Sequence, residues 1–530
     1  MKRHRLRLLT GRWAVSKYKE QGRIQGGENE IVVEVARTPP SMPYPRSGAG
    51  RGNAPAPHPS GVPIDVDHRV ESVASRLDPG RLAEDSNAAV YRFTKEAWSN
   101  LIPKEYAPSR TLLACLVPVA VVAIGIGLLG VNIPYVDQFG FIALLARMRT
   151  NVLTLSDLFA QNNENRPFFP RLIWLGLAGL SHYDIRLELW ANLAIALGTF
   201  AFFAIHAIRT WTQFDVSAPS MLLPLMSFLV FNLAQWESWL QGFQTVMFLG
   251  SACVVVGFFV LTGKPTWRSF GWAVFAGGVG AFSTPNALLY WPIGLVVLLV
   301  TVPSNLRLIR SVLWTACGAA CVFLFMAGWK GTPGYSPGAI GTDVLSRAYW
   351  VTNFLGAPLM TVPDLAFPFG VLSVGVCLLT IGHLARTRNW KPLVSYFAIA
   401  AFVVASGFLV SMGRMRLGIV QAVAPRYLTI SVWYWVSLLT LVPLIPLRGV
   451  PQRVFYSLIC VCLLWHTVWG ALCANAFHLR MLPAYETAVS GGFMSDEVLE
   501  GVVRPGTYDE ARRYLQYLAD NKLSAYAVTP

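Results

Sequence analysis

Charged residues are scarce in this sequence: Asp, Glu, Lys and Arg make up 13% of its 530 residues. Soluble globular proteins carry about 25%. Hydrophobic residues make up 54%, and many of them stand in long runs without a charge. Runs of this length are typical of helices that cross a lipid bilayer. The scarcity of charge therefore excludes an ordinary soluble protein and predicts an all-α integral membrane protein.

Acidic residues are fewer than basic ones, 28 against 43, which leaves a net charge of +15. A nucleic-acid-binding protein gathers such an excess on one face or stripe. Here the basic residues stand in short clusters between apolar runs, the arrangement that the positive-inside rule produces in membrane proteins. We therefore expect membrane lipid, and no nucleic acid, as a partner.

The sequence also lacks a phosphate-binding P-loop and the HExxH motif of zinc peptidases. Its eight cysteines all lie within, or at the end of, the apolar runs. Buried cysteine usually behaves as a small hydrophobic residue. The even number of cysteines therefore does not indicate disulfides.

The first 95 residues have no long apolar run, and none stands near Met1, so we expect no cleavable signal peptide. Twelve of the 25 residues from Pro39 to Pro63 are Pro or Gly, a composition that cannot build a core. Residues 1–95 are predicted to be a disordered cytoplasmic tail. Residues 88–106 mix aromatic residues with lysines and predict a short interfacial helix.

Eleven apolar runs predict eleven membrane spans in a domain of residues 96–474. A span needs about 20 apolar residues, and the third and fifth runs are shorter, so the expected count is ten to twelve. The predicted spans are residues 111–133, 187–209, 219–234, 243–263, 269–284, 286–303, 311–329, 367–385, 393–412, 428–447 and 453–474.

The short loops predict the orientation. With the N-terminus in the cytoplasm, the inner loops hold ten Lys and Arg residues against one acid, Asp215, as the positive-inside rule requires. This orientation predicts a protein of the cytoplasmic (inner or plasma) membrane. It places residues 134–186, 330–366 and 475–530 on the extracytoplasmic side.

The C-terminal segment, residues 475–530, is mostly polar. Residues 507–510 match a capping box, and Tyr508, Ala511, Leu515 and Leu518 follow at helical spacing. We expect a small amphipathic helix that packs against the outer face.

Two acids flank predicted surface helices in the first outer segment. Asp137 stands just beyond the first span, and Glu164 precedes residues 172–180, an apolar run too short to cross a bilayer. Arg166 and Arg171 follow Glu164 closely. A carboxylate that deprotonates a hydroxyl, beside arginines that hold a phosphate, predicts a site for group transfer. The alternative is that these loop charges are only solvated.

The other outer connections also carry charges. Glu237 stands among tryptophans, and Arg414 and Arg426 flank the turn before the tenth span. Placing Arg426 against the lipid core costs about 2.5–3.5 kcal/mol unless it snorkels or pairs. Glu188, at the start of the second span, is expected to be solvated at the interface, with a position lining a cavity as the alternative. Because charges capable of chemistry gather in the outer connections, we favour a site there over a scaffold.

The order of these features resembles the GT-C superfamily of polytopic glycosyltransferases, especially the branch of protein O-mannosyltransferases and lipid A aminoarabinose transferases. The resemblance runs over about fifty residues, from Asp137 in Tyr-Val-Asp-Gln-Phe, through Glu164 in Asn-Glu-Asn-Arg-Pro, to Arg186 at the start of the second span. It implies that Asp137 is the catalytic aspartate. Many members have two adjacent acids at this point, whereas Gln138 follows Asp137 here.

The resemblance implies transfer of a sugar from a polyprenyl-phosphate donor to an envelope glycan, lipid or protein acceptor on the extracytoplasmic face. Asp137 is then the general base and Glu164 orients the acceptor or a cation. The remaining site residues bind substrate or phosphate: Arg166, Arg171, Arg186, Glu237, Arg414 and Arg426. The resemblance fixes no cofactor. A divalent cation stays an open alternative, because one carboxylate beside an amide is a poor site for it.

Other classes of membrane protein fit parts of the pattern. A transporter or lipid flippase predicts charges in the middle of spans, where this sequence has almost none. An O-antigen polymerase or ligase would use a late outer loop, and residues 330–366 offer Lys330 and Arg347. A catalytically inactive scaffold is the third alternative. The acid directly after the first span favours the glycosyltransferase.

Overall fold

The computed structural model describes residues 109–216, 220–331, 344–387, 390–445 and 450–528. The predictions for residues 1–95 and 88–106 lie outside these ranges. The described residues fold almost entirely into helices, and their one β-bridge joins Asn162 to Asn165. The predicted all-α class is confirmed for this part of the chain.

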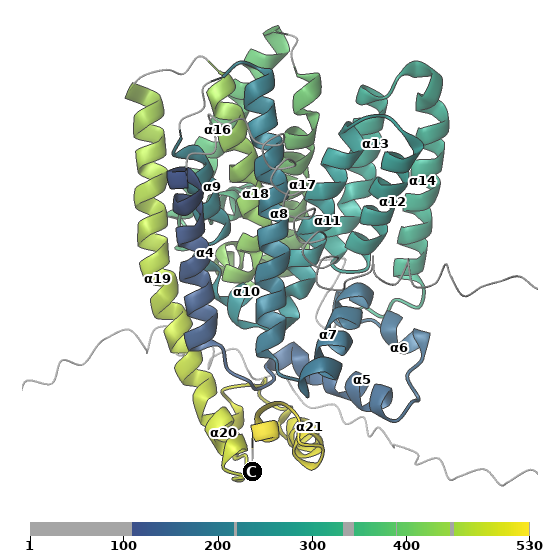
Figure 1. Cartoon of the computed structure of the whole chain (residues 1–530), viewed down its shortest axis with the longest axis vertical. Helices are drawn as coiled ribbons and strands as arrows, with labels where there is room; N and C mark the ends of the chain where they lie inside the picture. Colours follow the sequence, from purple (N-terminus) through teal and green to yellow (C-terminus); the bar gives the residue numbers. More distant parts are fainter. Residues whose placement is uncertain (1–108, 217–219, 332–343, 388–389, 446–449, 529–530) are drawn as a thin grey trace, which may run out of the picture. The chain divides into compact units, whose positions relative to one another are not determined.

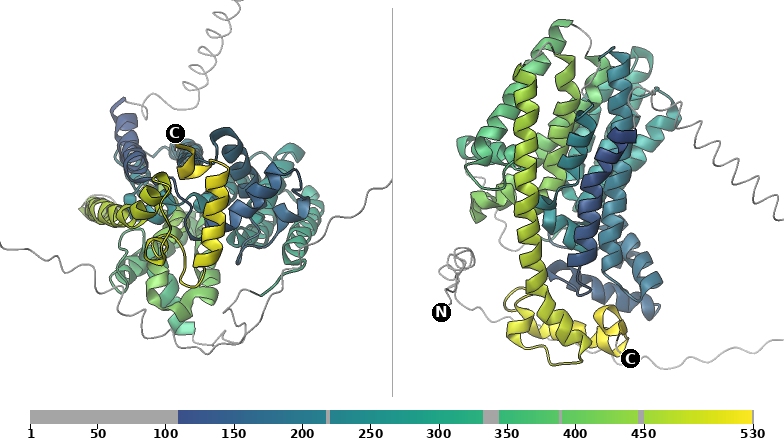
Figure 2. Two further views of the ribbon diagram at one scale, coloured as in Figure 1. Left: turned by 90° about the horizontal axis from the view of Figure 1, so that it is seen from below. Right: turned by 60° about the vertical axis from the view of Figure 1, so that its left-hand side comes forward.

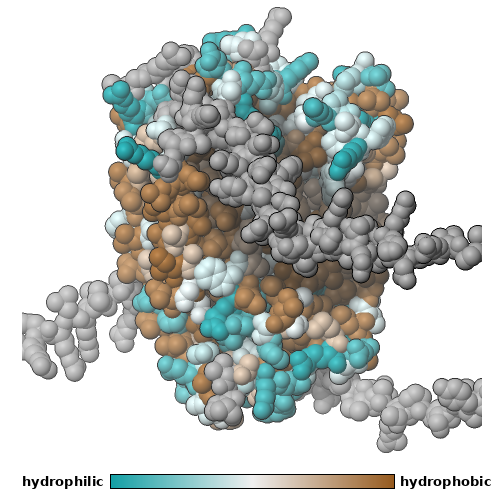
Figure 3. Space-filling view, viewed as in Figure 1, coloured by the Kyte–Doolittle hydropathy of each residue, from teal (hydrophilic) through white to brown (hydrophobic). Residues whose placement is uncertain are grey.

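Eight of the described helices are long and apolar enough to cross a membrane. Figure 1 shows them running alongside one another, and Figure 3 shows a hydrophobic band between two more hydrophilic ends. The chain is therefore a multi-pass α-helical membrane protein. The eight are α4 (Ser109–Leu129), α8 (Arg186–Gln213), α11 (Thr245–Thr262), α14 (Ser304–Met326), α16 (Ala366–Thr387), α17 (Val394–Arg414), α18 (Pro425–Leu441) and α19 (Val450–Val489).

The other three predicted spans coincide with shorter helices. These are α9 (Leu222–Val230), α12 (Trp267–Ala281) and α13 (Tyr290–Thr301), of 9, 15 and 12 residues. At 1.5 Å per residue, α9 reaches less than half of the hydrocarbon thickness. The helical segments occur where the sequence predicted them, but the predicted count of ten to twelve spans is not confirmed.

Helix α18 lies at the centre of the bundle, with 89% of its apolar stretch buried. It packs against α9, α11, α16 and α17. Two of its polar ring groups have backbone partners: Trp435 Nε1 donates to Leu355 O at 2.6 Å, and the Tyr434 hydroxyl donates to Ser373 O at 3.2 Å. Satisfied donors of this kind let α18 carry aromatic residues in a dry core.

One end of the bundle carries the described residues of 134–181 and 490–528, and we call it the outer end after the predicted orientation. Here α5 (Phe139–Arg149), α6 (Leu155–Phe159) and α7 (Phe168–Ser181) follow one another after α4, as expected for the first outer segment. In Figure 2, α21 (Tyr508–Asp520) lies across the same end of the bundle. Ala511, Leu515 and Leu518 of α21 are buried, which confirms the predicted amphipathic helix.

The structure of the C-terminal segment differs from the sequence pattern in two respects. Helix α19 has 40 residues and continues to Val489, because Phe477, Met481 and Ala484 bury an apolar face beyond the predicted end of the span. The predicted capping box at residues 507–510 is not formed. Thr507 makes no side-chain cap and instead donates its hydroxyl to Arg504 O at 2.8 Å.

A second hydrophobic cluster, separate from the bundle core, holds the outer end together. It joins α5 and α7 to the end of α19, to α20 (Asp496–Leu499) and to α21. The outer segments are therefore packed against one another by buried side chains. Its members include Ile133, Phe139, Phe141, Trp174, Phe477, Leu499, Val502, Leu515 and Leu518.

Candidate functional site at the outer end

Asp137 lies on a strained turn. The 3-10 helix Val136–Gln138 connects α4 to α5, and Val136 has a φ of 42°. A β-branched residue rarely adopts a positive φ, and such strain persists only where surrounding contacts hold it. The Val136 amide donates to Val502 O at 2.8 Å. The C-terminal segment therefore helps to hold the turn that carries Asp137.

Gln138 fixes the same turn from the other side. Its Oε1 accepts from the Tyr135 amide at 3.2 Å, and its Nε2 donates to Glu188 Oε2 at 2.8 Å. Glu188 is 3% exposed, so the expectation that it is solvated is wrong. Gly242 makes room for this pair, because a Cβ there would lie 1.8 Å from Glu188 Oε2. The glutamine after Asp137 thus anchors the turn.

The Asp137 carboxylate presents one oxygen to two donors. Asn163 Nδ2 donates to Asp137 Oδ1 at 3.1 Å, and Arg504 Nη2 donates to the same atom at 3.2 Å. Asp137 Oδ2 has no hydrogen-bond partner among the described residues, and the side chain is 30% exposed. One oxygen is held while the other is available, which is the arrangement that a general base requires.

Glu164 also follows a residue with positive φ, Asn163, whose φ is 50°. Backbone hydrogen bonds of 2.9 Å in both directions between Asn162 and Asn165 close this tight turn. Glu164 forms an ion pair with Arg414, the last residue of α17. Because Asn163 contacts Asp137, this turn brings both predicted catalytic acids to one place.

A second ion pair joins Glu237 on α10 (Trp236–Leu240) to Arg426 in the first turn of α18. Arg426 Nη1 lies 3.1 Å from Glu237 Oε2, and its Nη2 donates to Gln421 Oε1 at 2.6 Å. The guanidinium carbon lies 4.9 Å from the centre of the Tyr427 ring. Pairing therefore satisfies the arginine that the sequence placed at the edge of the membrane.

Tyr135 connects the two halves of the site. It lies within electrostatic range of Asp137, Glu237, Arg426 and Arg480, and burial raises the pKa of its hydroxyl. Arg414 lies within range of Tyr427 and Arg426 as well as Glu164. Hydrogen bonds, ion pairs and this electrostatic proximity together connect what we call the outer polar ring, formed by Tyr135, Asp137, Asn163, Glu164, Arg414, Tyr427, Arg426 and Glu237.

Arg166 and Arg171 are not directed at the ring acids. Arg166 is 8% exposed and donates to Phe325 O at 2.5 Å, to Phe159 O at 3.0 Å and to Ala327 O. Arg171 donates to the carbonyls of residues 157, 158 and 160. Burial lowers the pKa of the Arg171 guanidinium to about 10. Both arginines brace the first outer segment, and phosphate binding by them stays a prediction.

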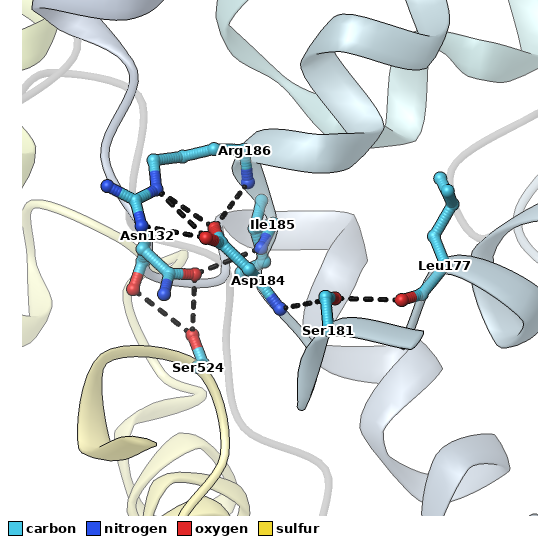
Figure 4. A network of polar contacts seen from close by, with 7 residues as sticks. All are labelled: Asn132, Leu177, Ser181, Asp184, Ile185, Arg186 and Ser524. Atoms are coloured by element: carbon cyan, nitrogen blue, oxygen red, sulfur yellow. Dashed lines mark hydrogen bonds and ion pairs between the residues drawn. The ribbon is translucent and has the colours of Figure 1, made fainter. Parts of the chain in front are cut away.

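Arg186 belongs to a different contact network, at the corner between α7 and α8. Figure 4 shows its guanidinium folded onto Asp184, with Nη2 2.7 Å from Oδ2 and Nε 2.9 Å from Oδ1. Asn132 Oδ1 accepts from the Ile185 amide at 2.9 Å, and the Ser524 hydroxyl donates to Asn132 O at 3.1 Å. The described hydrogen bonds of the Arg186 side chain are therefore made to Asp184 at this corner and not to Asp137.

A hydrophobic cavity of about 1210 Å³ lies among α16, α17, α18 and α15 (Val344–Gly356). Along α17 its lining runs from Phe397 to Met412, and Arg414 ends the helix two residues later. Phe408 lines the cavity and is 49% exposed, so the cavity opens on the outside of the bundle. Buried Arg347 places its Cζ 5.7 Å from the centre of the Phe408 ring.

Sequence reasoning missed four members of the site: Tyr135, Asn163, Arg504 and Tyr427, which directly follows Arg426 in the sequence. Tyr135 and Asn163 stand beside the two acids, so their sequence positions offered a signal. Arg504 offered only its place in an outer segment, since 367 residues separate it from Asp137. Among the described residues, no group of three or more His, Cys, Asp or Glu side chains is arranged to hold a metal ion.

The fold and the site define a multi-pass α-helical membrane protein with a polar site at one end and a hydrophobic cavity beside it. No family model, curated protein or solved structure matches this chain. Its function therefore has to be inferred from the geometry of the site.

Proposed function

We propose that this protein is a membrane glycosyltransferase that uses a polyprenyl-phosphate-linked sugar as donor. The acceptor is an envelope glycan, lipid or protein on the extracytoplasmic face of the cytoplasmic membrane. The observation that carries this proposal is the hydrophobic cavity along α17, whose lining ends two residues before Arg414. A lipid chain fits such a cavity, while its phosphate meets the arginine at the end of the helix.

The outer polar ring supplies the groups that a single displacement needs. Asp137 Oδ2 takes the proton of the acceptor hydroxyl, and the acceptor oxygen attacks the anomeric carbon of the sugar. The bond between that carbon and the phosphate oxygen breaks, and the polyprenyl phosphate leaves with the electron pair. Arg414 and Arg426 stabilise the charge that develops on the phosphate.

The ion pairs of the ring place both arginines in advance of the reaction. Each guanidinium is held by one carboxylate, Glu164 for Arg414 and Glu237 for Arg426. A guanidinium has five N–H donors, so further donors remain for a phosphate. Glu164 and Glu237 therefore position the two phosphate-binding arginines. Glu164 also directly follows Asn163, which contacts Asp137, so it can orient an acceptor beside Asp137.

The test is transfer of radiolabelled sugar from polyprenyl-phosphate donors in membranes that contain the full chain or Asp137→Asn. Removing a general base costs about 10²–10⁴-fold in rate, so we expect transfer by the variant to fall by that factor. Asp509→Asn, in a highly exposed acid on α21, is the matched control and retains activity. Full activity of Asp137→Asn, or no transfer by the wild type from any donor, contradicts the proposal.

A further inference from the structure

The C-terminal segment reaches the predicted catalytic aspartate directly. Arg504 lies between α20 and α21, and its Nη2 is 3.2 Å from Asp137 Oδ1. Two residues earlier, Val502 O accepts from the amide of Val136 at 2.8 Å. One short stretch therefore contacts both the backbone and the carboxylate of the turn that carries Asp137.

The position of this stretch is fixed by buried contacts. Val502 is fully buried and Val503 is 5% exposed, and both belong to the second hydrophobic cluster. Arg480 on α19 donates to Glu500 O at 2.8 Å. Farther on, the Ser524 amide donates to His182 O at 3.0 Å. Arg504 is thus presented from an anchored backbone, although its own side chain is 63% exposed.

We propose that Arg504 is a positioning residue for Asp137, so that the C-terminal segment is part of the active site. This inference rests on the proposed function. Arg504 and Asn163 donate to the same oxygen, Oδ1, from segments that are distant in the sequence. Together they fix the rotation of the carboxylate and leave Oδ2 for the acceptor hydroxyl.

A positioning role differs from phosphate binding in what it changes. Arg504 acts on the base, so its loss lowers kcat and leaves the KM for the donor lipid nearly unchanged. A phosphate-binding arginine also contributes to the ground-state complex, so its loss raises that KM. A misplaced base costs a large part of the rate even when every substrate contact remains.

The experiment measures kcat and the donor KM of the purified full-length chain in lipid vesicles. The variants are Arg504→Ala, Arg504→Lys and Asn163→Ala, with Arg513→Ala as the control, because Arg513 is an exposed arginine of α21. We expect Arg504→Ala and Asn163→Ala to lower kcat about 10–100-fold with less than about 3-fold change in KM. Arg504→Lys restores most of the rate, since it keeps a cationic donor, and Arg513→Ala matches the wild type.

Other results would overturn either the positioning role of Arg504 or the proposed function itself. Wild-type kcat in Arg504→Ala, or an effect confined to KM, overturns the positioning role while leaving the proposed function intact. Equal losses in Arg504→Ala and Arg504→Lys also overturn it. Absence of transfer by the wild type, from every polyprenyl-phosphate donor tried, overturns the proposed function and this inference with it.

Discussion

The two ends of the helix bundle use charge in opposite ways. At the outer end, the described acids and arginines form ion pairs between segments distant in sequence, such as Glu164 with Arg414 and Glu237 with Arg426. At the opposite end, which we call the inner end, Arg310 donates to the backbone at Pro265 O, at 2.6 Å, and lies 5.0 Å from the Trp267 ring centre. Every ion pair identified among the described residues involves one of the outer segments or, for Glu237 and Arg426, two of the shorter outer connections.

This contrast distinguishes two reasons for a charge near a membrane. A cation in an inner loop needs no partner, because its position relative to the bilayer is what sets the orientation of the chain. A charge in the outer polar ring has a definite partner and a definite geometry. Such geometry is a requirement of binding or catalysis, whereas orientation requires only the count of cations.

Among substitutions that compare the outer and inner ends of the bundle, Arg414→Ala is expected to have the largest effect on the rate of sugar transfer. Removing a donor that stabilises a developing anionic charge costs about 10²–10³-fold in kcat. The same substitution at Arg416, which is exposed in the same turn, and Arg268→Gln at the inner end should leave transfer unchanged. Sugar transfer in membranes measures all three. Equal losses in Arg414→Ala and Arg268→Gln would remove the contrast between the ends.

A stability effect of about 1–3 kcal/mol, typical of overpacking, is expected for Gly242→Ala. The added Cβ would lie 1.8 Å from Glu188 Oε2 and 2.7 Å from Gln138 Nε2, so the pair that anchors the Asp137 turn must shift. Gly140→Ala is the matched control, because nothing lies within 4 Å of its Cβ in α5. Thermal unfolding in detergent should show a lower Tm for the first variant and an equal or higher Tm for the second.

The smallest effect concerns Asp157, which caps α6 in the first outer segment. Hydrogen bonds from the Thr154 amide and hydroxyl, at 2.9 and 2.8 Å, lower the pKa of this carboxyl, and Arg147 adds to the effect. A lowered pKa stabilises the fold above the ordinary value of about 4, and that contribution is lost as the pH falls through the folded value. We expect Asp157→Asn to lower Tm slightly at pH 7.

The difference in Tm between wild type and Asp157→Asn should shrink below about pH 4, where the wild-type carboxyl takes up a proton. The comparison of the two proteins at each pH cancels the titration of other groups. An equal difference at pH 7 and pH 3 would show that the charge of Asp157 contributes nothing to the cap.

Local patterns predicted the elements of this fold but not all of their limits. Apolar runs located the long helices, because burial in lipid depends on the hydrophobicity of consecutive residues. The end of α19 was missed, since residues 475–489 are mixed in polarity and are held helical by packing within the second hydrophobic cluster. The capping box did not form for a local reason, because Thr507 donates its hydroxyl to the carbonyl of Arg504 in the preceding turn.

The sequence identified several residues of the site, but it did not identify which of them contact one another. Asp137, Glu164, Glu237, Arg414 and Arg426 were singled out because each is a charged residue in an outer connection beside a membrane helix, and the structure gathers them in the outer polar ring. Arg166 was singled out on the same ground, yet it donates to backbone carbonyls. The type of a residue and its position near the membrane therefore do not distinguish a member of the outer polar ring from an arginine that only holds the backbone of the first outer segment.

The sequence by itself determined that the chain is helical, that it crosses a membrane several times and that chemistry-bearing residues gather in the segments between spans. Hydrophobicity and charge are properties of neighbouring residues, so they can be read along the chain. Only the tertiary structure decided which charges pair. The partners of Glu237, Glu164 and Asp137 lie 189, 250 and 367 residues away, and the packing of the helices and of the outer cluster sets these contacts.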